Sequence, residues 1–377
     1  MKIIFAPDSF KGSIRSPEVC EILLRAFQEK LPGAEFCCVP LADGGEGTVV
    51  AVLAARPGEL REATVHDPLG RPISAQYAFF PESCQAVLEM ASASGLELLS
   101  AAERNPLLTS TYGSGELIRA AIAAGAKDII IGIGGSATVD GGAGLVQALG
   151  AKLLDASGQD LPPGGGMLEH LASIAAGELP ALCRGISIKV ACDVTNPLLG
   201  ATGAAAVFGP QKGASPEMVC SLEKGLQRWS EKVSAAGLAD TSDQPGDGAA
   251  GGVGFALRAF LGGQMCSGAR LIAELVGLPG HLQQADWIIT GEGCTDEQTC
   301  YGKLPAIVAE LAAAQGVPCI LLSGAVKGPQ ALLRQKFTAV FSSLSETGSL
   351  EAALSRAREN LYDRALAVAS LLVPRQV

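Results

Sequence analysis

Acidic residues recur in the glycine-rich segments that follow apolar runs in this sequence. They are Asp8, Asp43, Glu46, Asp140, Asp193, Glu292 and Asp296. Where a parallel strand ends in a glycine-rich loop and a helix begins, backbone N–H groups and the helix dipole bind anions. A site that combines such amides with several carboxylates needs a cation, and Mg²⁺ with a phosphorylated nucleotide satisfies both groups.

Each of these loops also has a purely structural interpretation. Asp43 and Glu46 could cap a helix that begins near Thr48, and Asp193 could form a turn before TNP (195–197). The GGSATVDGG segment (134–142) is as compatible with a tight packing turn as with a phosphate nest. Three polar groups at the end of a strand favour function for Asp193.

Two lysines lie in comparable positions. Lys11 follows Asp8 and Ser9 in the first loop, which favours a ligand over bare solvent. Lys212 lies between glycines in GPQKGA (209–214), where we expect an exposed ammonium that meets either phosphate or solvent.

Several other mechanisms are excluded or weakened by missing motifs. The three histidines lie outside the glycine-rich loops, and neither a P-loop nor the H-R-D and D-F-G motifs of protein kinases occur. GDGAAG (246–251) matches a dinucleotide fingerprint, but LADTSDQP precedes it where a strand is needed. We therefore expect close helix packing there, and a nicotinamide oxidoreductase is only a distant alternative.

The elements that must position these loops follow a strand, loop and helix rhythm. KIIFA (2–6) predicts a buried strand, followed by a helix with Ser16 at its N-cap that ends near Lys30. AEFCCVP (34–40), KDIIIGIGG (127–135), ISIKVACDV (186–194), ADWIITGEG (285–293) and VPCILLSGA (317–325) predict further strands, each followed by a loop. This alternation is typical of an α/β protein with parallel sheets.

The pattern changes from Glu59 to Leu99, where shorter strands joined by turns are predicted. The most linker-like segment is SAAGLADTSDQPGDG (234–248). We expect two domains: a discontinuous, Rossmann-like, doubly wound domain from residues 1–60 and 280–377, and an inserted α/β domain with a mixed sheet over residues 61–279.

Composition limits the classes of binding partner and the cellular location that we expect for this protein. The 377 residues carry a net charge of −10 and no cluster of Lys and Arg, which argues against nucleic acid and favours a small ligand. The N-terminus lacks a signal-peptide core and no apolar run could span a membrane, so we expect a cytoplasmic protein. The 11 cysteines contain no C-x-x-C, so we expect reduced, mostly buried thiols.

Several of these segments, taken in order, resemble the bacterial glycerate kinase family. They are APDSFKGS (6–13), PLADGGEGT (40–48), GIGGSAT with DGGAG (132–144), ACDVTNPLLG (191–200), FGPQKGA (208–214), GAAGG (248–252) and ITGEG with a later GK (289–303). The resemblance runs nearly end to end. It implies ATP-dependent phosphorylation of D-glycerate to 2-phosphoglycerate in a cleft between two domains, with Mg²⁺ and ATP as cofactors. The oligomeric state stays open, with a homodimer as one candidate.

Loop position and charge then suggest individual roles. Asp193 would accept or orient the proton of the substrate hydroxyl, and Lys11 and Lys303 would neutralise developing charge or the glycerate carboxylate. Asp43 and Glu46 would hold Mg²⁺. Substrate contacts are expected from Asp8, Ser9, Asn196, Glu292 and Asp296, and nucleotide phosphate contacts from Gly134, Gly135, Ser136, Thr138 and Lys212.

Three positions depart from the family pattern. Val139 stands where the family usually has Asn, Cys294 where it usually has Arg, and Asp247 where it usually has a small residue. An Arg would supply five hydrogen-bond donors and a fixed positive charge that Cys294 lacks. Phosphorylation of a different small hydroxy acid is therefore the first alternative.

Overall fold

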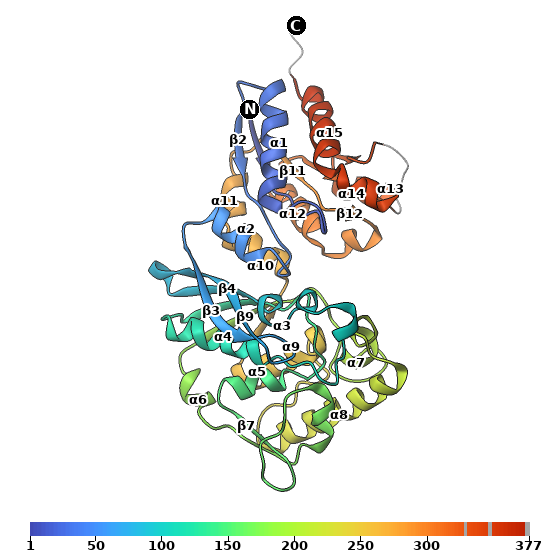
Figure 1. The fold of residues 1–377 in the computed structure, drawn as a ribbon. Coiled ribbons are helices and arrows are strands. Elements are labelled where there is room, and N and C mark those ends of the chain that lie inside the picture. The colour runs from blue at the N-terminus through green and yellow to red at the C-terminus, as the bar shows by residue number, and fades with distance from the viewer. Residues whose placement is uncertain (328–329, 346–348, 374–377) are drawn as a thin grey trace. The chain divides into compact units, whose positions relative to one another are not determined.

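The computed structural model describes residues 1–327, 330–345 and 349–373, and the chain divides into two compact units (Figure 1). Unit 1 comprises residues 1–43, 50–57 and 269–377, and unit 2 comprises residues 44–49 and 58–268. The chain therefore leaves unit 1 and returns to it, with α2 (Thr48–Ala55) and α10 (Gly268–Leu275) spanning two of the boundaries.

Unit 1 is built on a parallel five-stranded sheet in the order β15-β13-β11-β1-β2. Its strands are β1 (Lys2–Phe5), β2 (Glu35–Cys38), β11 (Trp287–Thr290), β13 (Cys319–Ser323) and β15 (Ala339–Ser342). A two-stranded pair is formed by β12 (Cys294–Thr295) and β14 (Ala325–Val326). Its helices are α1 (Ser16–Lys30), α11 (Leu278–Leu282), α12 (Leu304–Ala313), α13 (Gln330–Lys336), α14 (Leu350–Ser355) and α15 (Ala357–Leu371), with a 3₁₀ helix η6 (Glu297–Tyr301).

The strands of unit 1 are apolar on both faces because helices cover both. Ile3 and Phe5 pack into a core with residues of α1 and α15, and the Phe5 and Phe27 rings meet edge to face at 5.0 Å. Ile4, which points to the opposite face, is also fully buried. This confirms the predicted parallel sheet and the first strand.

The start of α1 differs from the sequence prediction by one residue. Arg15 occupies the N-cap position in an extended conformation, and no side chain caps the helix there. Ser16 is already helical, and Pro17 lies within the first turn, where its missing N–H breaks no hydrogen bond. The prediction that Ser16 is the N-cap was therefore wrong, whereas the predicted end of the helix at Lys30 is confirmed.

Unit 2 contains a mixed six-stranded sheet in the order β10-β9-β6-β5-β4-β3. Its strands are β3 (Glu59–His66), β4 (Pro72–Phe80), β5 (Gln85–Glu89), β6 (Asp128–Gly132), β9 (Ser187–Ala191) and β10 (Gln264–Cys266). The β3–β4 and β4–β5 pairs are antiparallel and the others are parallel. The change of pattern after Glu59 therefore marks this antiparallel edge, and the predicted mixed sheet is confirmed.

Helices, a small hairpin and 3₁₀ segments complete unit 2. The helices are α3 (Ala91–Ser94), α4 (Tyr112–Ala123), α5 (Ala143–Ala148), α6 (Leu179–Leu182), α7 (Ala204–Phe208), α8 (Pro216–Ala235) and α9 (Ala249–Leu261). The hairpin pairs β7 (Lys152–Leu154) with β8 (Ser173–Ala175). The 3₁₀ helices are η1 (Pro81–Ser83), η2 (Leu96–Leu98), η3 (Ala101–Glu103), η4 (Gly165–His170) and η5 (Pro210–Lys212).

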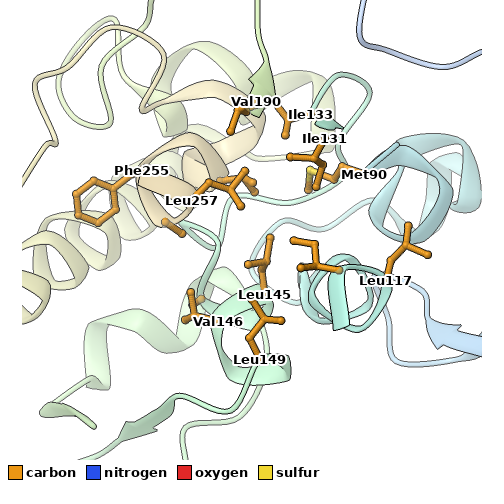
Figure 2. Close-up of a cluster of buried hydrophobic side chains, with 14 of the residues drawn as sticks. Met90, Leu117, Ile131, Ile133, Leu145, Val146, Leu149, Val190, Phe255 and Leu257 are labelled. Carbon is orange, nitrogen blue, oxygen red and sulfur yellow. The ribbon is translucent and has the colours of Figure 1, made fainter. Parts of the chain in front are cut away.

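The core of unit 2 lies between this sheet and its helices. Figure 2 shows Ile131 and Val190 of the central strands together with Leu117 of α4, Leu145 of α5 and Leu257 of α9. All five side chains are essentially excluded from solvent. This packing holds the carboxyl ends of β6 and β9 on a rigid base.

The GDGAAG segment forms the sharp entry into α9. Ala250, Gly251 and Gly252 take left-handed conformations in succession, and the Gly251 carbonyl oxygen accepts from Gly141 N of the GGSATVDGG loop at 3.0 Å. Turns precede the segment where a dinucleotide site needs a strand. Close backbone packing, as predicted, accounts for these glycines.

The cysteine prediction holds only in part. All 11 thiols are free, but only Cys20, Cys300 and Cys319 are buried, so the expectation of mostly buried thiols was wrong. Several lie on short strands at sheet edges or in loops, where one face is open to solvent.

Across the described residues, no helix combines the length and apolarity that a bilayer crossing requires.

We predict that Gly251→Ala strongly destabilises unit 2. An added Cβ would lie 1.9 Å from the Thr138 carbonyl oxygen, and φ is +73°. The matched control is Gly158→Ala, where φ is +76° but nothing lies within 4 Å. Urea denaturation should show a loss of about 1 kcal/mol for the control, from the left-handed backbone alone, and about 3 kcal/mol or more for Gly251→Ala. Equal losses would contradict the steric argument.

Candidate functional site

Unit 1 gathers polar groups at the point where its strand order reverses. The chain runs from β1 to β2 on one side, whereas β11, β13 and β15 extend the sheet on the other. Asp8 follows β1 and Glu292 follows β11, and Asp8 N donates to Gly291 O at 2.9 Å. The carboxyl ends of strands at such a switch point are where open α/β sheets bind ligands.

Asp8 is a buried carboxyl among other acids. Burial raises its pKa to about 7, with a further increase from the neighbouring charges of Asp43 and Glu292. The backbone N–H of Ser9 donates to Asp8 at 2.6 Å, and both this bond and Lys11 oppose the increase. The group therefore titrates near neutrality and is readily ionised by an approaching cation.

Lys11 and Asp43 form a solvent-accessible ion pair beside Asp8. The Lys11 Nζ lies 3.9 Å from Asp43 Oδ2, and the Lys11 side chain is 83% exposed. A pair of this kind stabilises the fold by little, because water screens it. Both groups are consequently available to a ligand.

Glu292 is held by hydroxyl groups that the sequence analysis did not select. Thr295 and Thr299 donate to its Oε1 at 3.0 Å and 2.6 Å, and Ser323 lies 2.8 Å from the Thr295 hydroxyl. Burial raises the pKa of Glu292, while the Thr299 hydrogen bond and Lys303 oppose the increase. The only sequence signal for Ser323 was its place at the end of an apolar strand.

Asp296 and Lys303 form a second, half-exposed pair in unit 1. Their charged atoms are 3.2 Å apart, and both side chains remain partly accessible. Cys294, at the departure from the family pattern, is exposed on β12. Unit 1 therefore brings together the predicted residues Asp8, Ser9, Lys11, Asp43, Glu292, Asp296 and Lys303 at one end of its sheet.

In unit 2, Gly44 packs against the ends of β6 and β9 with no room for a side chain. A Cβ on Gly132 would meet the Gly44 carbonyl oxygen at 1.9 Å, and one on Gly44 would meet Ala191 at 2.6 Å. Glu89 of β5 accepts from Val49 N, in the first turn of α2, at 2.6 Å. Glu46 is exposed. A carboxylate from β5 therefore takes part in holding the start of α2.

Lys212 is not the exposed lysine that its glycine neighbours suggested. Its side chain is 2% exposed, and its ammonium donates to Ser136 Oγ and to the Thr138 carbonyl oxygen, both at 2.7 Å. Burial lowers its pKa to about 7, although Asp140 opposes this. The prediction of exposure was wrong because tertiary packing places η5 against the GGSATVDGG loop.

Asp140 belongs to the same buried layer. Its carboxylate accepts from Thr111 N and Oγ1, both at 2.8 Å, and from Gly142 N and Gly144 N at the start of α5. Burial raises its pKa, and these hydrogen bonds oppose the increase. Asp140 therefore has a structural role, and Thr138 keeps a buried hydroxyl without a hydrogen-bond partner among the described residues.

The accessible part of unit 2's loops lies at Gly134, Gly135 and Asp193. Both glycines are exposed, with Gly135 at φ +75°, whereas Ser136 and Thr138 are buried. Asp193 is exposed and accepts from Gly268 N at 3.0 Å, at the start of α10. Asn196 donates to Thr202 O at 2.8 Å, which fixes the loop after β9.

Comparison with known proteins gives the family to which this chain belongs. The sequence model of the glycerate kinase family matches residues 3–373. The chain belongs to the glycerate kinase family. Family membership over the whole length makes it an enzyme of the kinase class, as predicted.

Individual members of the glycerate kinase family are similar over nearly the full chain. Glycerate 2-kinase of Escherichia coli K12 is 45% identical over 373 residues, 99% of this chain and 98% of the relative. Glycerate kinase of Bacillus subtilis 168 is 44% identical, covering 98% and 97%. A crystal structure assigned to glycerate kinase 2 of Salmonella typhimurium LT2 has a TM-score of 0.88 at 46% identity, covering 99% and 98%.

The donor set at the unit 1 sheet fits the Mg²⁺ ion that the sequence analysis predicts. The charge of Asp43 disfavours ionisation of the buried Asp8, and a hard cation held by Asp43 would remove that repulsion. Among the described residues, no three His, Cys, Asp or Glu side chains form a ready-made cage. Mg²⁺ is usually held by one or two carboxylates plus substrate phosphates, so Asp43 with one further carboxylate would suffice.

We predict that Lys212 makes the stability of unit 2 increase with pH above neutrality. Its pKa is about 7 in the folded chain and near 10.5 when unfolded, so unfolding takes up a proton between these values. Relative to Lys212→Met, the wild-type free energy of unfolding should rise by about 1 kcal/mol per pH unit from pH 7 to 9, measured by urea denaturation. A difference that is constant with pH would contradict this titration.

Proposed function

We propose that this chain transfers the γ-phosphoryl group of ATP to D-glycerate and forms 2-phosphoglycerate. The observation that carries the proposal is the convergence of Asp8, Asp43 and Glu292 with two lysines at the switch point of the unit 1 sheet. This set combines oxygen ligands for a cation with ammonium groups for anions. The names of the relatives supply the acceptor, glycerate, and the 2-position.

In unit 1, we assign the two accessible lysines to anionic groups. Lys11 and Lys303 each already face a carboxylate and keep part of their surface in solvent, so a carboxylate or phosphate can approach them. Asp8, Ser9, Glu292 and Asp296 would accept from or orient the hydroxyl groups of glycerate. Glu292 suits this role because Thr295 and Thr299 fix its orientation.

In unit 2, the exposed loop after β6 would contact the nucleotide phosphates. Gly134 and Gly135 can offer backbone amides, because the absence of side chains lets a phosphate approach closely. Lys212 supports this loop from beneath, through Ser136 and the Thr138 carbonyl. We therefore assign Ser136, Thr138 and Lys212 to holding the loop's shape and its electrostatic potential.

Asp193 and Asn196 belong to the loop after β9. Asp193 would accept the hydroxyl proton of the acceptor, or orient that hydroxyl, and Gly268 N holds the carboxylate in place. Bound Mg²⁺, with Asp43 and Glu46 as its proposed protein ligands, would neutralise charge on the transferred phosphoryl group. Positioning by these residues would then supply most of the rate enhancement.

Another small hydroxy acid is the second candidate acceptor. It is favoured by Cys294, an exposed thiol where the family pattern usually has the fixed charge of an Arg. Side-by-side turnover on D-glycerate, L-glycerate and other short hydroxy acids distinguishes the two. The higher kcat/KM identifies the acceptor.

We predict that the purified chain with Mg-ATP and D-glycerate releases ADP and one phosphorylated product. A phosphate on carbon 2 couples to a single proton, so the proton-coupled phosphorus NMR signal should be a doublet. A triplet would place the phosphate on the CH₂ group at carbon 3 and overturn the proposed position. Absence of ADP with D-glycerate, but not with another acid, would overturn the proposed acceptor. Chelation with EDTA should abolish turnover if Mg²⁺ is required.

We predict that Asp193→Asn lowers kcat by about 100-fold or more in a coupled ADP assay, because an amide cannot accept the proton. Asn keeps an acceptor for Gly268 N, so thermal stability should change little. The control Asp160→Asn removes an exposed carboxylate elsewhere in unit 2 and should leave kcat unchanged. Near-normal kcat in Asp193→Asn would leave the residue with a capping role alone.

A further inference from the structure

Three cysteines lie where α1 meets β2, and the proposed function uses none of them. Cys20 is on α1, whereas Cys37 and Cys38 are the last two residues of β2. The helix and the strand pack against each other within unit 1 (Figure 1). The chemistry of these thiols therefore depends on which of them meet across this contact.

Cys20 and Cys38 are neighbours across the contact between α1 and β2. The Cys38 thiol donates to the Cys20 carbonyl oxygen, with its Sγ 3.9 Å from that oxygen. Cys20 is 2% exposed, and its Sγ lies 3.6 Å from the Phe5 carbonyl oxygen on β1. Cys38, by contrast, is exposed. One thiol of the pair is thus open to solvent and the other is enclosed behind it.

Cys37 points away from this pair. Successive side chains on a strand face opposite sides of the sheet, and the Cys37 Sγ lies 3.5 Å from His281 Nδ1 on α11. A bond between Cys37 and Cys38 would require the strand to abandon its extended geometry, which the β1–β2 ladder holds in register from Lys2 to Phe5. Cys20 is therefore the geometric partner of Cys38.

The contact also gives the two sulfurs different reactivity. The hydrogen bond from Cys20 lowers the pKa of the Cys38 thiol, and burial opposes this only in part. Burial and the same contact raise the pKa of the Cys20 thiol. The thiolate is the nucleophile in oxidation, so the exposed member of the pair reacts first.

We propose that Cys20 and Cys38 form a reversible disulfide when the chain meets a hydroperoxide. The Cys38 thiolate attacks the peroxide, forms a sulfenic acid and releases hydroxide when the peroxide is H₂O₂. The Cys20 sulfur then attacks the Cys38 sulfur, and the sulfenic oxygen leaves with the Cys20 proton and a second proton as water. The peroxide is reduced, and the two thiols lose two hydrogen atoms in total.

The fold favours closure of this disulfide over further oxidation of Cys38. The Cys38 Sγ already lies 3.9 Å from the Cys20 carbonyl oxygen, so movement of the two side chains brings the sulfurs towards the S–S bonding distance of about 2.0 Å. The buried Cys20 lies beside Cys38 and would act as the resolving thiol for its sulfenic acid. The bond would join α1 to the strand that leads into the loop bearing Asp43.

Peptide mapping of the full-length chain tests the proposal. The reduced chain is treated with one equivalent of hydrogen peroxide, blocked with N-ethylmaleimide and digested with trypsin. We expect peptide 16–25, which contains Cys20, to be linked to peptide 31–61, which contains Cys37 and Cys38. Phosphine reduction should release both peptides with unmodified thiols.

Two variants locate the linkage. Cys37→Ser, on the same strand but the opposite face, should keep the link at the wild-type yield. Cys20→Ser should abolish it and let a 1,3-dione reagent trap the Cys38 sulfenic acid. The proposal is overturned if the wild-type chain itself carries the dione adduct on Cys38 without the link, if the link is lost in Cys37→Ser, or if it joins two chains. The wild-type and Cys37→Ser results decide the question even if Cys20→Ser folds poorly.

Discussion

Repulsion between carboxylates at the carboxyl end of the unit 1 sheet sets the chemistry that this protein can perform. Parallel strands bring Asp8, Asp43 and Glu292 to one edge, and burial makes the ionisation of Asp8 and of Glu292 harder. Hydrogen bonds from the Ser9 backbone N–H to Asp8, and from the Thr295 and Thr299 hydroxyls to Glu292, offset part of the increase in pKa that burial causes. Lys11 and Lys303 offset a further part, although the Lys11 side chain is mostly exposed and the Lys303 side chain is partly exposed. The balance favours ligands that bring positive charge, as a metal-bound nucleotide does.

In unit 2 the constraint on the loops is steric. Its loops approach one another so closely that a Cβ would collide with backbone at Gly132, at Gly248 and at Gly251. The glycine excess therefore serves backbone packing as much as ligand contact. A loop held by such contacts has few alternative conformations, so the exposed amides of Gly134 and Gly135 are fixed in place before any ligand arrives.

The sequence predicted the features that depend on local pattern and missed those that depend on tertiary packing. Short apolar runs before glycine-rich loops located β1, β6, β9, β11 and β13, because buried parallel strands read as continuous apolar segments. Lys212 was misjudged, since nothing in GPQKGA reveals that Ser136 and Thr138 enclose it. Thr295, Thr299 and Ser323 were missed for the same reason: a hydroxyl gains its role only from the carboxylate that the fold brings beside it.

Exposure distinguishes Asp140 and Lys212, which hold the fold, from other charged residues in similar glycine-rich segments. Asp140 and Lys212 are enclosed, and their hydrogen bonds go to Thr111, to Ser136 and to loop backbone. A ligand could reach neither without opening the loop. Lys11, Glu46 and Asp193 lie in the same kind of glycine-rich segment but face solvent. Among these five residues, a similar sequence context therefore gives two that support the loops and three that a ligand can reach, and roles in phosphoryl transfer are proposed for those three.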